Sequence, residues 1–162
     1  MEEKIEILLP TYNGEKYLKE QLDSILNQSY KNIKLIISDD CSKDSTPEIL
    51  KEYKEKDDRV DIYLQEQNLG VVKNIEFLLR KVDSKIFMLA DQDDYWLPEK
   101  VRKSFEKLEK ENVDIVFGDL EVVDKDLKMI YPSFNDYMLL SRRIEKYINT
   151  DRLNYLYNCF TG

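Results

Sequence analysis

A short acidic segment carries the residues of this chain that are best suited to chemistry. In FMLADQDDYWLPEK, three carboxylates stand within four positions, at Asp91, Asp93 and Asp94. One aspartate is enough to cap a helix that begins near Pro98, so capping leaves most of the cluster unexplained. Carboxylates held this close repel one another unless a cation neutralises them. The cluster therefore predicts a metal site.

The available donor types favour a hard cation. The chain contains no histidine, and its two cysteines, Cys41 and Cys159, are far apart in sequence. Histidine triads and imidazole ligands are therefore excluded from this chain, and the cysteines form neither a metal-binding pattern nor a disulfide framework. Carboxylate oxygens favour Mg²⁺ or Mn²⁺, an ion that also allows an acidic loop to accept a diphosphate. A general base in this chain has to be a carboxylate, lysine, tyrosine or cysteine.

Two more polar loops follow predicted strands, PTYNGE at residues 10–15 and SDDCSKDS at residues 38–45. Each has a purely structural alternative. Asn13 is able to cap a helix, and Asp39 with Asp40 is able to form an acidic turn before a helix N-terminus. The carboxyl ends of parallel strands share one edge of a sheet, and ligands bind there in open α/β folds. We therefore expect both loops to lie beside the acidic segment.

Strand-like and helix-like segments alternate along the chain. Apolar runs predict strands at residues 5–10, 33–40, 60–64, 85–90, 113–119 and 127–132. Spaced apolar residues and helix-start signals predict helices at residues 14–27, 45–56 and 70–82, and a fourth that Pro98 opens. The second helix is expected to start with a capping box from Ser45 to Glu48. After Tyr131, residues 137–148 are predicted to be helical and the remainder is ambiguous.

This alternation predicts an α/β fold with a mainly parallel sheet and helices on both faces. The 162 residues suffice for one core, and the net charge of −8 argues against binding to bare nucleic acid. No apolar run reaches the roughly 20 residues that span a bilayer, and the sequence shows no signal segment. We therefore expect a cytoplasmic protein without a transmembrane segment.

Three quoted blocks together resemble a known family. They are ILLPTYNGEKYLKEQLDSILNQSYKNIKLIISDDCSKDST, NLGVVKN and MLADQDDYWLPEKV, and the resemblance runs from about Ile5 to Asp119. The chain is similar to the inverting family 2 glycosyltransferases, which have the Rossmann-like GT-A fold and use nucleotide-activated sugars. The resemblance implies a nucleotide-sugar binding domain over residues 1–131 and the incomplete start of an acceptor-side region over residues 132–162.

The resemblance also assigns roles to individual residues. It implies nucleotide contacts for Pro10, Thr11, Tyr12, Asn13, Asp39, Asn68, Gly70, Lys73, Asp91 and Gln92. Tyr12 is expected against the base, and Asp39 is expected to accept the N3–H of uracil or thymine. Asp93 is expected as the main metal ligand, with Asp91 and Asp94 beside it. For Trp96 we expect packing in the core rather than a place in the sugar pocket.

The implied reaction is a single displacement at the anomeric carbon of a UDP- or dTDP-sugar. A carboxylate base takes the proton of the acceptor hydroxyl, and the acceptor is a saccharide or is linked to a lipid. A lipid-linked acceptor is compatible with peripheral association at a membrane. The chain ends at Gly162, so we expect a truncated protein whose base lies beyond this residue. The DQDDYW form is similar to a subset of the family that transfers rhamnose from dTDP-rhamnose.

Two other classes of protein with strand-end aspartates place these aspartates at different positions from those in this chain. An aspartate-based phosphatase has its Asp-x-Asp pair after the first strand, with threonine at the fifth motif position, where this chain has Tyr95. A phospho-acceptor receiver domain has an acidic pair at the end of the first strand, but here Pro-Thr-Tyr-Asn follows that strand. A non-catalytic module that binds nucleotide sugars is a further alternative. Metal-dependent binding of UDP or dTDP separates the transferase from the first two classes.

Overall fold

The computed structural model describes residues 2–137 and 156–157, and the chain divides into two compact units, Met1–Lys100 and Val101–Gly162. The first unit holds a four-stranded sheet of β1 (Ile5–Thr11), β2 (Ile33–Asp39), β3 (Val60–Leu64) and β4 (Ile86–Leu89). The strands lie in the order β3-β2-β1-β4, and all three pairings are parallel. The predicted parallel α/β sheet is confirmed.

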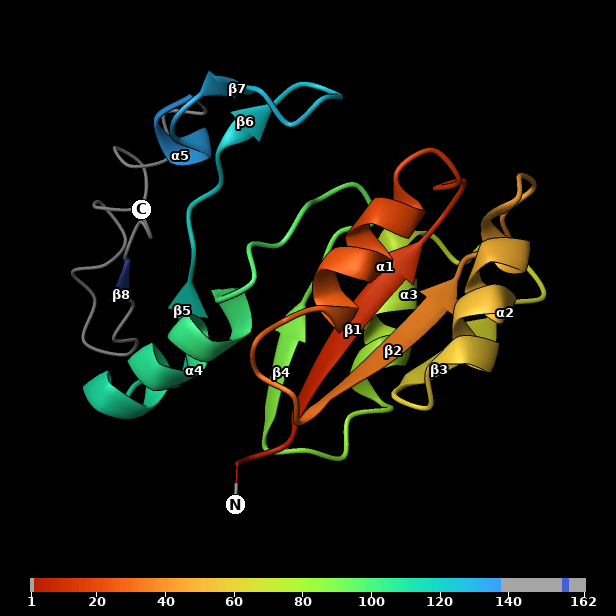
Figure 1. Cartoon of the computed structure of the whole chain (residues 1–162). Helices are drawn as coiled ribbons and strands as arrows, with labels where there is room; N and C mark the ends of the chain where they lie inside the picture. The colour runs from red at the N-terminus through yellow and green to blue at the C-terminus, as the bar shows by residue number, and fades with distance from the viewer. Residues whose placement is uncertain (1, 138–155, 158–162) are drawn as a thin grey trace. The chain divides into compact units, whose positions relative to one another are not determined.

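Three helices of the first unit cover the sheet. Figure 1 shows α1 (Leu18–Leu26) and α2 (Thr46–Lys56) on one face and α3 (Val71–Leu79) on the other. On the α3 face, Leu78 packs against Leu8 of β1 and Ile36 of β2. The central strands β1 and β2 are consequently buried on both faces, which explains why they read as nearly continuous apolar runs.

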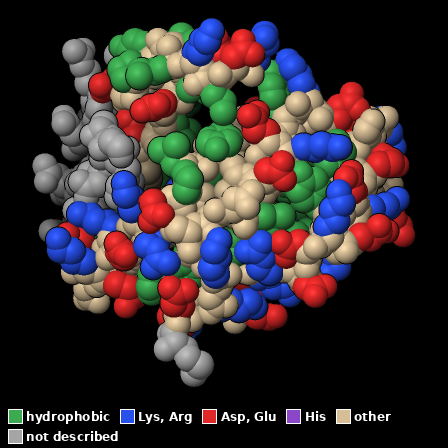
Figure 2. All heavy atoms as spheres, in the orientation of Figure 1, with side chains coloured by type: hydrophobic (Ala, Val, Ile, Leu, Met, Phe, Trp, Pro, Cys, Tyr) green, Lys and Arg blue, Asp and Glu red, His purple; other side chains and the backbone are tan. Residues whose placement is uncertain are grey.

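The surface of this unit mixes charges of both signs. Figure 2 shows lysine and arginine side chains interspersed with acidic ones on the face that carries α1 and α2. An exposed ion pair of 3.6 Å joins Lys19 of α1 to Glu52 of α2. Within the described residues, no helix is both long and apolar enough to cross a membrane.

One predicted helix start is wrong, and another predicted helix is too long. The first helix begins at Leu18 rather than at residue 14, because a turn precedes it in which Tyr17 N–H and Leu18 N–H both donate to Gly14 O. Asn13 is not its N-cap, since Tyr17 holds that position. The third helix begins at Val71 and ends at Leu79, so it is shorter than the predicted span of residues 70–82. Gly70 lies outside it, with φ +81° and ψ 155°.

The predicted capping box at Ser45 is also wrong. Ser45 is the N-cap residue of α2, but its side chain makes no capping hydrogen bond. Asp44 takes that role, because its Oδ1 accepts from Thr46 N–H at 3.0 Å. Ser45 N–H donates to Glu15 Oε2 at 2.9 Å, so the start of α2 is tied to the loop after β1.

The second unit follows a different pattern. It comprises all but the first residue of α4 (Lys100–Glu111), together with β5 (Val116–Phe117), β6 (Val122–Val123), β7 (Met129–Tyr131), α5 (Phe134–Tyr137) and β8 (Leu156–Tyr157). β5 pairs in parallel with β8, and β6 and β7 form an antiparallel pair. The predicted strand at residues 113–119 is therefore only two residues long, and the predicted sixth strand belongs to a separate hairpin. Most of the predicted helix at 137–148 lies outside the described residues, and the domain boundary after residue 131 stays a prediction.

Candidate functional site

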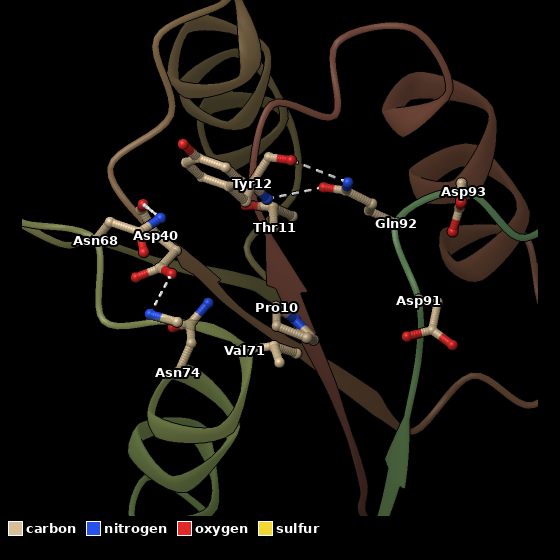
Figure 3. Close-up of a pocket in the computed structure, with 11 residues that line it drawn as sticks. Pro10, Thr11, Tyr12, Asp40, Asn68, Val71, Asn74, Asp91, Gln92 and Asp93 are labelled. Carbon is tan, nitrogen blue, oxygen red and sulfur yellow. Dashed lines mark hydrogen bonds between the residues drawn. The ribbon is translucent and has the colours of Figure 1, made fainter.

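A pocket of about 350 Å³ opens at the carboxyl ends of the sheet strands (Figure 3). Its walls come from the ends of β1 and β2, the loop between β3 and α3, the start of α3 and the acidic segment after β4. The lining residues are Pro10, Thr11, Tyr12, Asp40, Asn68, Gly70, Val71, Asn74, Asp91, Gln92 and Asp93. The three loops singled out in the sequence therefore meet at one edge of the sheet, as the parallel topology predicts.

The pocket contains most, but not all, of the expected residues. Eight predicted site residues line it, namely Pro10, Thr11, Tyr12, Asn68, Gly70, Asp91, Gln92 and Asp93. Four others, Asn13, Asp39, Lys73 and Asp94, are not among the lining residues. Three lining residues were not predicted, namely Asp40, Val71 and Asn74.

Asp39 and Asp40 are both buried but serve different partners. Asp39 Oδ1 accepts from Thr11 Oγ1 at 3.0 Å and from Ser42 Oγ at 2.5 Å, while its Oδ2 accepts from Ser42 N–H at 3.0 Å. The carboxylate of Asp39 thus joins the loop after β1 to the loop after β2. Asp40, only 3% exposed, is the acid of this pair that lines the pocket.

Asp40 also organises the loop before α3. Its two carboxylate oxygens accept from Leu69 N–H at 2.6 Å and from Gly70 N–H at 2.9 Å. Asn68 Nδ2 donates to the Asp40 main-chain oxygen at 3.2 Å. Each carboxylate oxygen has a second lone pair, so Asp40 can still accept a hydrogen bond from a ligand.

Asn74 is a pocket residue that sequence reasoning missed. It lies in the first turn of α3 and is 1% exposed, and its Nδ2 donates to Ser38 O at 2.9 Å. Its Oδ1 is buried and finds no hydrogen-bond donor among the described residues. A buried acceptor without a partner costs about 1–3 kcal/mol. The only available signal was an asparagine on the apolar side of a predicted helix.

Asn13 and Lys73 are placed outside the pocket. Asn13 N–H donates to Ser42 Oγ at 2.8 Å, and Asn13 Oδ1 accepts from Lys43 N–H at 2.8 Å. Asn13 therefore ties the loop after β1 to the loop after β2, at a φ of +49° that asparagine tolerates better than most residues. Lys73 is exposed on α3.

The carboxylates of the acidic segment lie in unlike surroundings. Asp91 and Asp93 are exposed, and within the described residues neither side chain has a hydrogen bond or an ion pair. Asp94 is half-buried. Burial raises the pKa of Asp94, the negative charges of Asp91 and Asp93 add to this, and Lys100 opposes it. Burial lowers the pKa of Lys100, against the opposing effect of Asp94.

Trp96 packs in the core, as expected from the sequence. It is 2% exposed, and its main-chain N–H donates to Ser24 Oγ of α1 at 3.0 Å. The ammonium group of Lys100 lies 4.9 Å from the centre of its ring. Trp96 is therefore joined to α1 through its main chain and is not among the residues that line the pocket.

The predicted three-aspartate metal cluster is not assembled. Among the described residues, no group of three acidic or cysteine side chains stands close enough to hold an ion. Asp91 and Asp93, whose carboxylates have no partner among the described residues, nevertheless line the pocket. That donor set fits Mg²⁺ or Mn²⁺, because such ions are commonly held by one or two carboxylates together with substrate phosphates.

Comparison with known proteins places this geometry in a family. The family described as glycosyl transferase family 2 matches residues 6–161. Glycosyltransferase GlyA of Streptococcus pneumoniae is 31% identical over 81% of this chain, and the aligned part is 19% of that protein. The putative teichuronic acid biosynthesis glycosyltransferase TuaG of Bacillus subtilis is 28% identical over 75% of this chain and 48% of its own length.

A solved structure has the same fold. The crystal structure of S. aureus TarS 1–349 in complex with UDP-GlcNAc aligns with a TM-score of 0.69 and 26% identity, over 75% of this chain and 36% of that one. The chain thus spans about a fifth to a half of the proteins that it matches. These likenesses decide against the phosphatase and receiver alternatives. With the family matched over residues 6–161, the chain belongs to glycosyl transferase family 2 and has its GT-A fold.

Proposed function

We propose that this chain is the donor-binding part of a metal-dependent, inverting glycosyltransferase that takes a UDP- or dTDP-sugar. One observation carries the proposal. The pocket is lined on one side by Asn74, whose buried Oδ1 has no hydrogen-bond donor among the described residues, and on another by Asp91 and Asp93, whose carboxylates have no partner there either. A nucleoside diphosphate with a cation is complementary to both, because its base donates hydrogen bonds and its phosphates need positive charge.

Base recognition rests on acceptor oxygens. Asp40 and Asn74 are buried lining residues whose oxygens suit the N3–H of uracil or thymine. Cytosine has an acceptor at this ring position, so it is discriminated against by the same oxygens. This is proposed in place of the expected role of Asp39, because Asp40 lines the pocket and Asp39 is not among the lining residues. Tyr12, with 47% of its surface exposed, lines the same pocket and supports stacking on the base.

The diphosphate and its cation belong beside the acidic segment. Asp93, with Asp91, is the residue proposed to hold Mg²⁺ or Mn²⁺. Such an ion stabilises the negative charge that develops on a departing nucleoside diphosphate. Asp94 is set back from the pocket and contributes negative charge there rather than a ligand.

In the transfer step, the pocket residues have a binding role only. They bind and orient the donor, while a carboxylate base removes the proton from the acceptor hydroxyl as the anomeric carbon is attacked from the opposite side. We place that base in the acceptor half of the whole protein. The acceptor is proposed to be a saccharide, free or linked to a lipid at the cytoplasmic face of a membrane. The relative TuaG, named for teichuronic acid biosynthesis, supports a role in polysaccharide or glycoconjugate synthesis.

Calorimetry with a nucleotide panel tests the proposal. UDP, dTDP, GDP and CDP are titrated into the protein with and without Mn²⁺. We expect UDP or dTDP to bind best and their affinity to rise with Mn²⁺, because the acidic segment repels a diphosphate that carries no cation. Equal binding of all four nucleotides, or tighter binding without metal, contradicts the proposal.

A further inference from the structure

The side chain of Gln92 is already engaged within the protein. Its Oε1 accepts from Tyr12 N–H at 2.9 Å, and its Nε2 donates to Tyr12 O at 3.1 Å (Figure 3). The two bonds fix the orientation of the amide, because an exchange of its oxygen and nitrogen would set donor against donor and acceptor against acceptor. Both polar atoms of the Gln92 side chain are therefore hydrogen-bonded to one residue of the loop after β1.

This contact continues the sheet beyond the point where the strands separate. The β1–β4 ladder runs up to the pair Leu8 and Leu89, and Ala90 N–H still donates to Leu8 O at 2.9 Å. After Ala90 the acidic segment leaves the sheet. The Gln92 amide takes the place of the main chain there and binds both backbone groups of Tyr12, as a neighbouring strand would.

Gly14 leaves the space that this contact needs. A Cβ atom at position 14 would lie 2.5 Å from Gln92 Oε1 and 2.9 Å from Gln92 Cδ. The φ of Gly14 is outside the left-handed region, so its backbone conformation does not require glycine. The glycine in PTYNGE is therefore explained by the close approach of a side chain from a segment 78 positions later.

We propose that Gln92 is a positioning residue, which clamps the acidic segment to the loop after β1 and so sets the distance between Asp91, Asp93 and Tyr12. It does not read the nucleotide, in contrast to the expectation from the sequence. The inference rests on the proposed function, because the clamp matters only if one ligand spans both sides of the pocket. Figure 3 shows the Gln92 side chain reaching to Tyr12, with the carboxylates of Asp91 and Asp93 lying apart from that pair.

Amide hydrogen exchange tests the clamp without any ligand. In the wild type, Tyr12 N–H is protected by Gln92 Oε1, although Tyr12 itself is exposed. Gln92→Met keeps the length of the side chain and removes both polar atoms. We expect the exchange of Tyr12 N–H to accelerate at least about tenfold in Gln92→Met, because the amide loses the acceptor that Gln92 provides. Gln67→Met, which alters an exposed glutamine outside the pocket lining, should leave that rate unchanged.

The effect on function is measured by comparing the affinity for UDP without metal and the affinity for UDP with Mn²⁺. Each half of the pocket remains intact in Gln92→Met, so binding of UDP without metal should stay within about twofold of wild type. The additional affinity that Mn²⁺ confers should fall about tenfold, the equivalent of about one to two lost hydrogen bonds. Equal losses with and without metal, together with a lowered melting temperature, would mean a purely structural role and would overturn the inference.

A double-mutant cycle with Gly14→Ala gives the sharpest test. Alone, Gly14→Ala pushes the Gln92 amide away and should also lower the Mn²⁺-dependent affinity about tenfold. In Gln92→Ala the amide is gone, so adding Gly14→Ala should cost less than about twofold more. Additive losses would overturn the inference. If the wild type binds no nucleotide at all, the proposed function fails, and the exchange rate of Tyr12 N–H still decides whether the clamp exists.

Discussion

The two ends of the central sheet treat their carboxylates in opposite ways. At the amino end of β1, Glu6 is fully buried and its Oε2 accepts from Asp83 N–H at 2.8 Å and from Ser84 N–H at 3.1 Å. Its Oε1 pairs with the Lys4 ammonium at 2.5 Å. At the carboxyl end, Asp91 and Asp93 are exposed and have no such partner among the described residues.

The difference separates an acid whose partners lie within the fold from the acids that are proposed to bind a ligand. Burial alone raises the pKa of Glu6, but the hydrogen bonds from Lys4, Ser84 N–H and Asp83 N–H outweigh it and hold that pKa below its usual value. The fold therefore supplies every partner that Glu6 needs. At the other end, two carboxylates and the Oδ1 atom of Asn74 have no partner among the described residues, and this contrast can be tested from both sides.

Removing a carboxylate from the unsatisfied end should have the largest effect. We expect Asp93→Ala to abolish the Mn²⁺ dependence of UDP or dTDP binding and to weaken metal binding by at least about 100-fold, more than the loss of an outer-shell partner costs. The measurement is calorimetry with and without Mn²⁺. Asp58→Ala is the matched control, because it removes one exposed acid just before the amino end of β3, whereas the pocket lies at the carboxyl ends of the strands. An unchanged metal response in Asp93→Ala would refute the assignment of Asp93.

Removing the free acceptor at the same end should be next in size. Asn74→Ala takes away the Oδ1 proposed to face the base and should weaken UDP binding about tenfold, close to 1.4 kcal/mol. The preference for UDP over CDP should shrink with it, since the discriminating oxygen is gone. Competition titrations measure both. A loss that is equal for the two nucleotides would assign Asn74 to the support of Ser38 alone.

The satisfied end should respond in stability instead. Glu6→Gln keeps the shape of the side chain and removes the charge, and we expect it to lower the free energy of unfolding by about 1–2 kcal/mol at pH 7. The pKa of Glu6 is lowered in the folded state, so its contribution is present above the unfolded value of about 4.5 and is lost as the pH falls through the folded value. The difference between variant and wild type in urea unfolding should therefore vanish in acid. A difference that persists at all pH values would mean that packing, not charge, is responsible.

An exposed ion pair outside both ends should matter least. Arg80 contacts Glu76 at 2.6 Å on the surface of α3, and both side chains are more than half exposed. Glu76→Gln should change the free energy of unfolding by no more than about 0.5 kcal/mol, with unchanged nucleotide binding. Urea unfolding at low and high salt measures it. A larger effect would blur the contrast between partnered and unpartnered acids on which the other predictions depend.

Much of the fold was predictable because its signals are local. Apolar runs alternating with helical periodicity predict the parallel sheet, and each polar loop at a strand end was predicted to reach one edge. The starts of the helices were harder to predict from the sequence. The loop after β1 forms a turn of its own, and Asp44 rather than Ser45 caps α2. The two loops are also joined across 29 positions, because Glu15 N–H donates to Asp44 Oδ2.

The sequence alone indicated the family, the strands that are followed by polar loops and the position of the acidic segment, because these follow from motifs and periodicity along the chain. Only the tertiary structure decided which neighbour faces the pocket. Adjacent residues at the end of a strand point to different sides, so Asp40 lines the pocket while Asp39 holds Thr11 and Ser42. The same holds for Gln92, whose partner Tyr12 is 80 positions earlier in the chain. No local pattern records such a contact, because it depends on where two strands stop pairing.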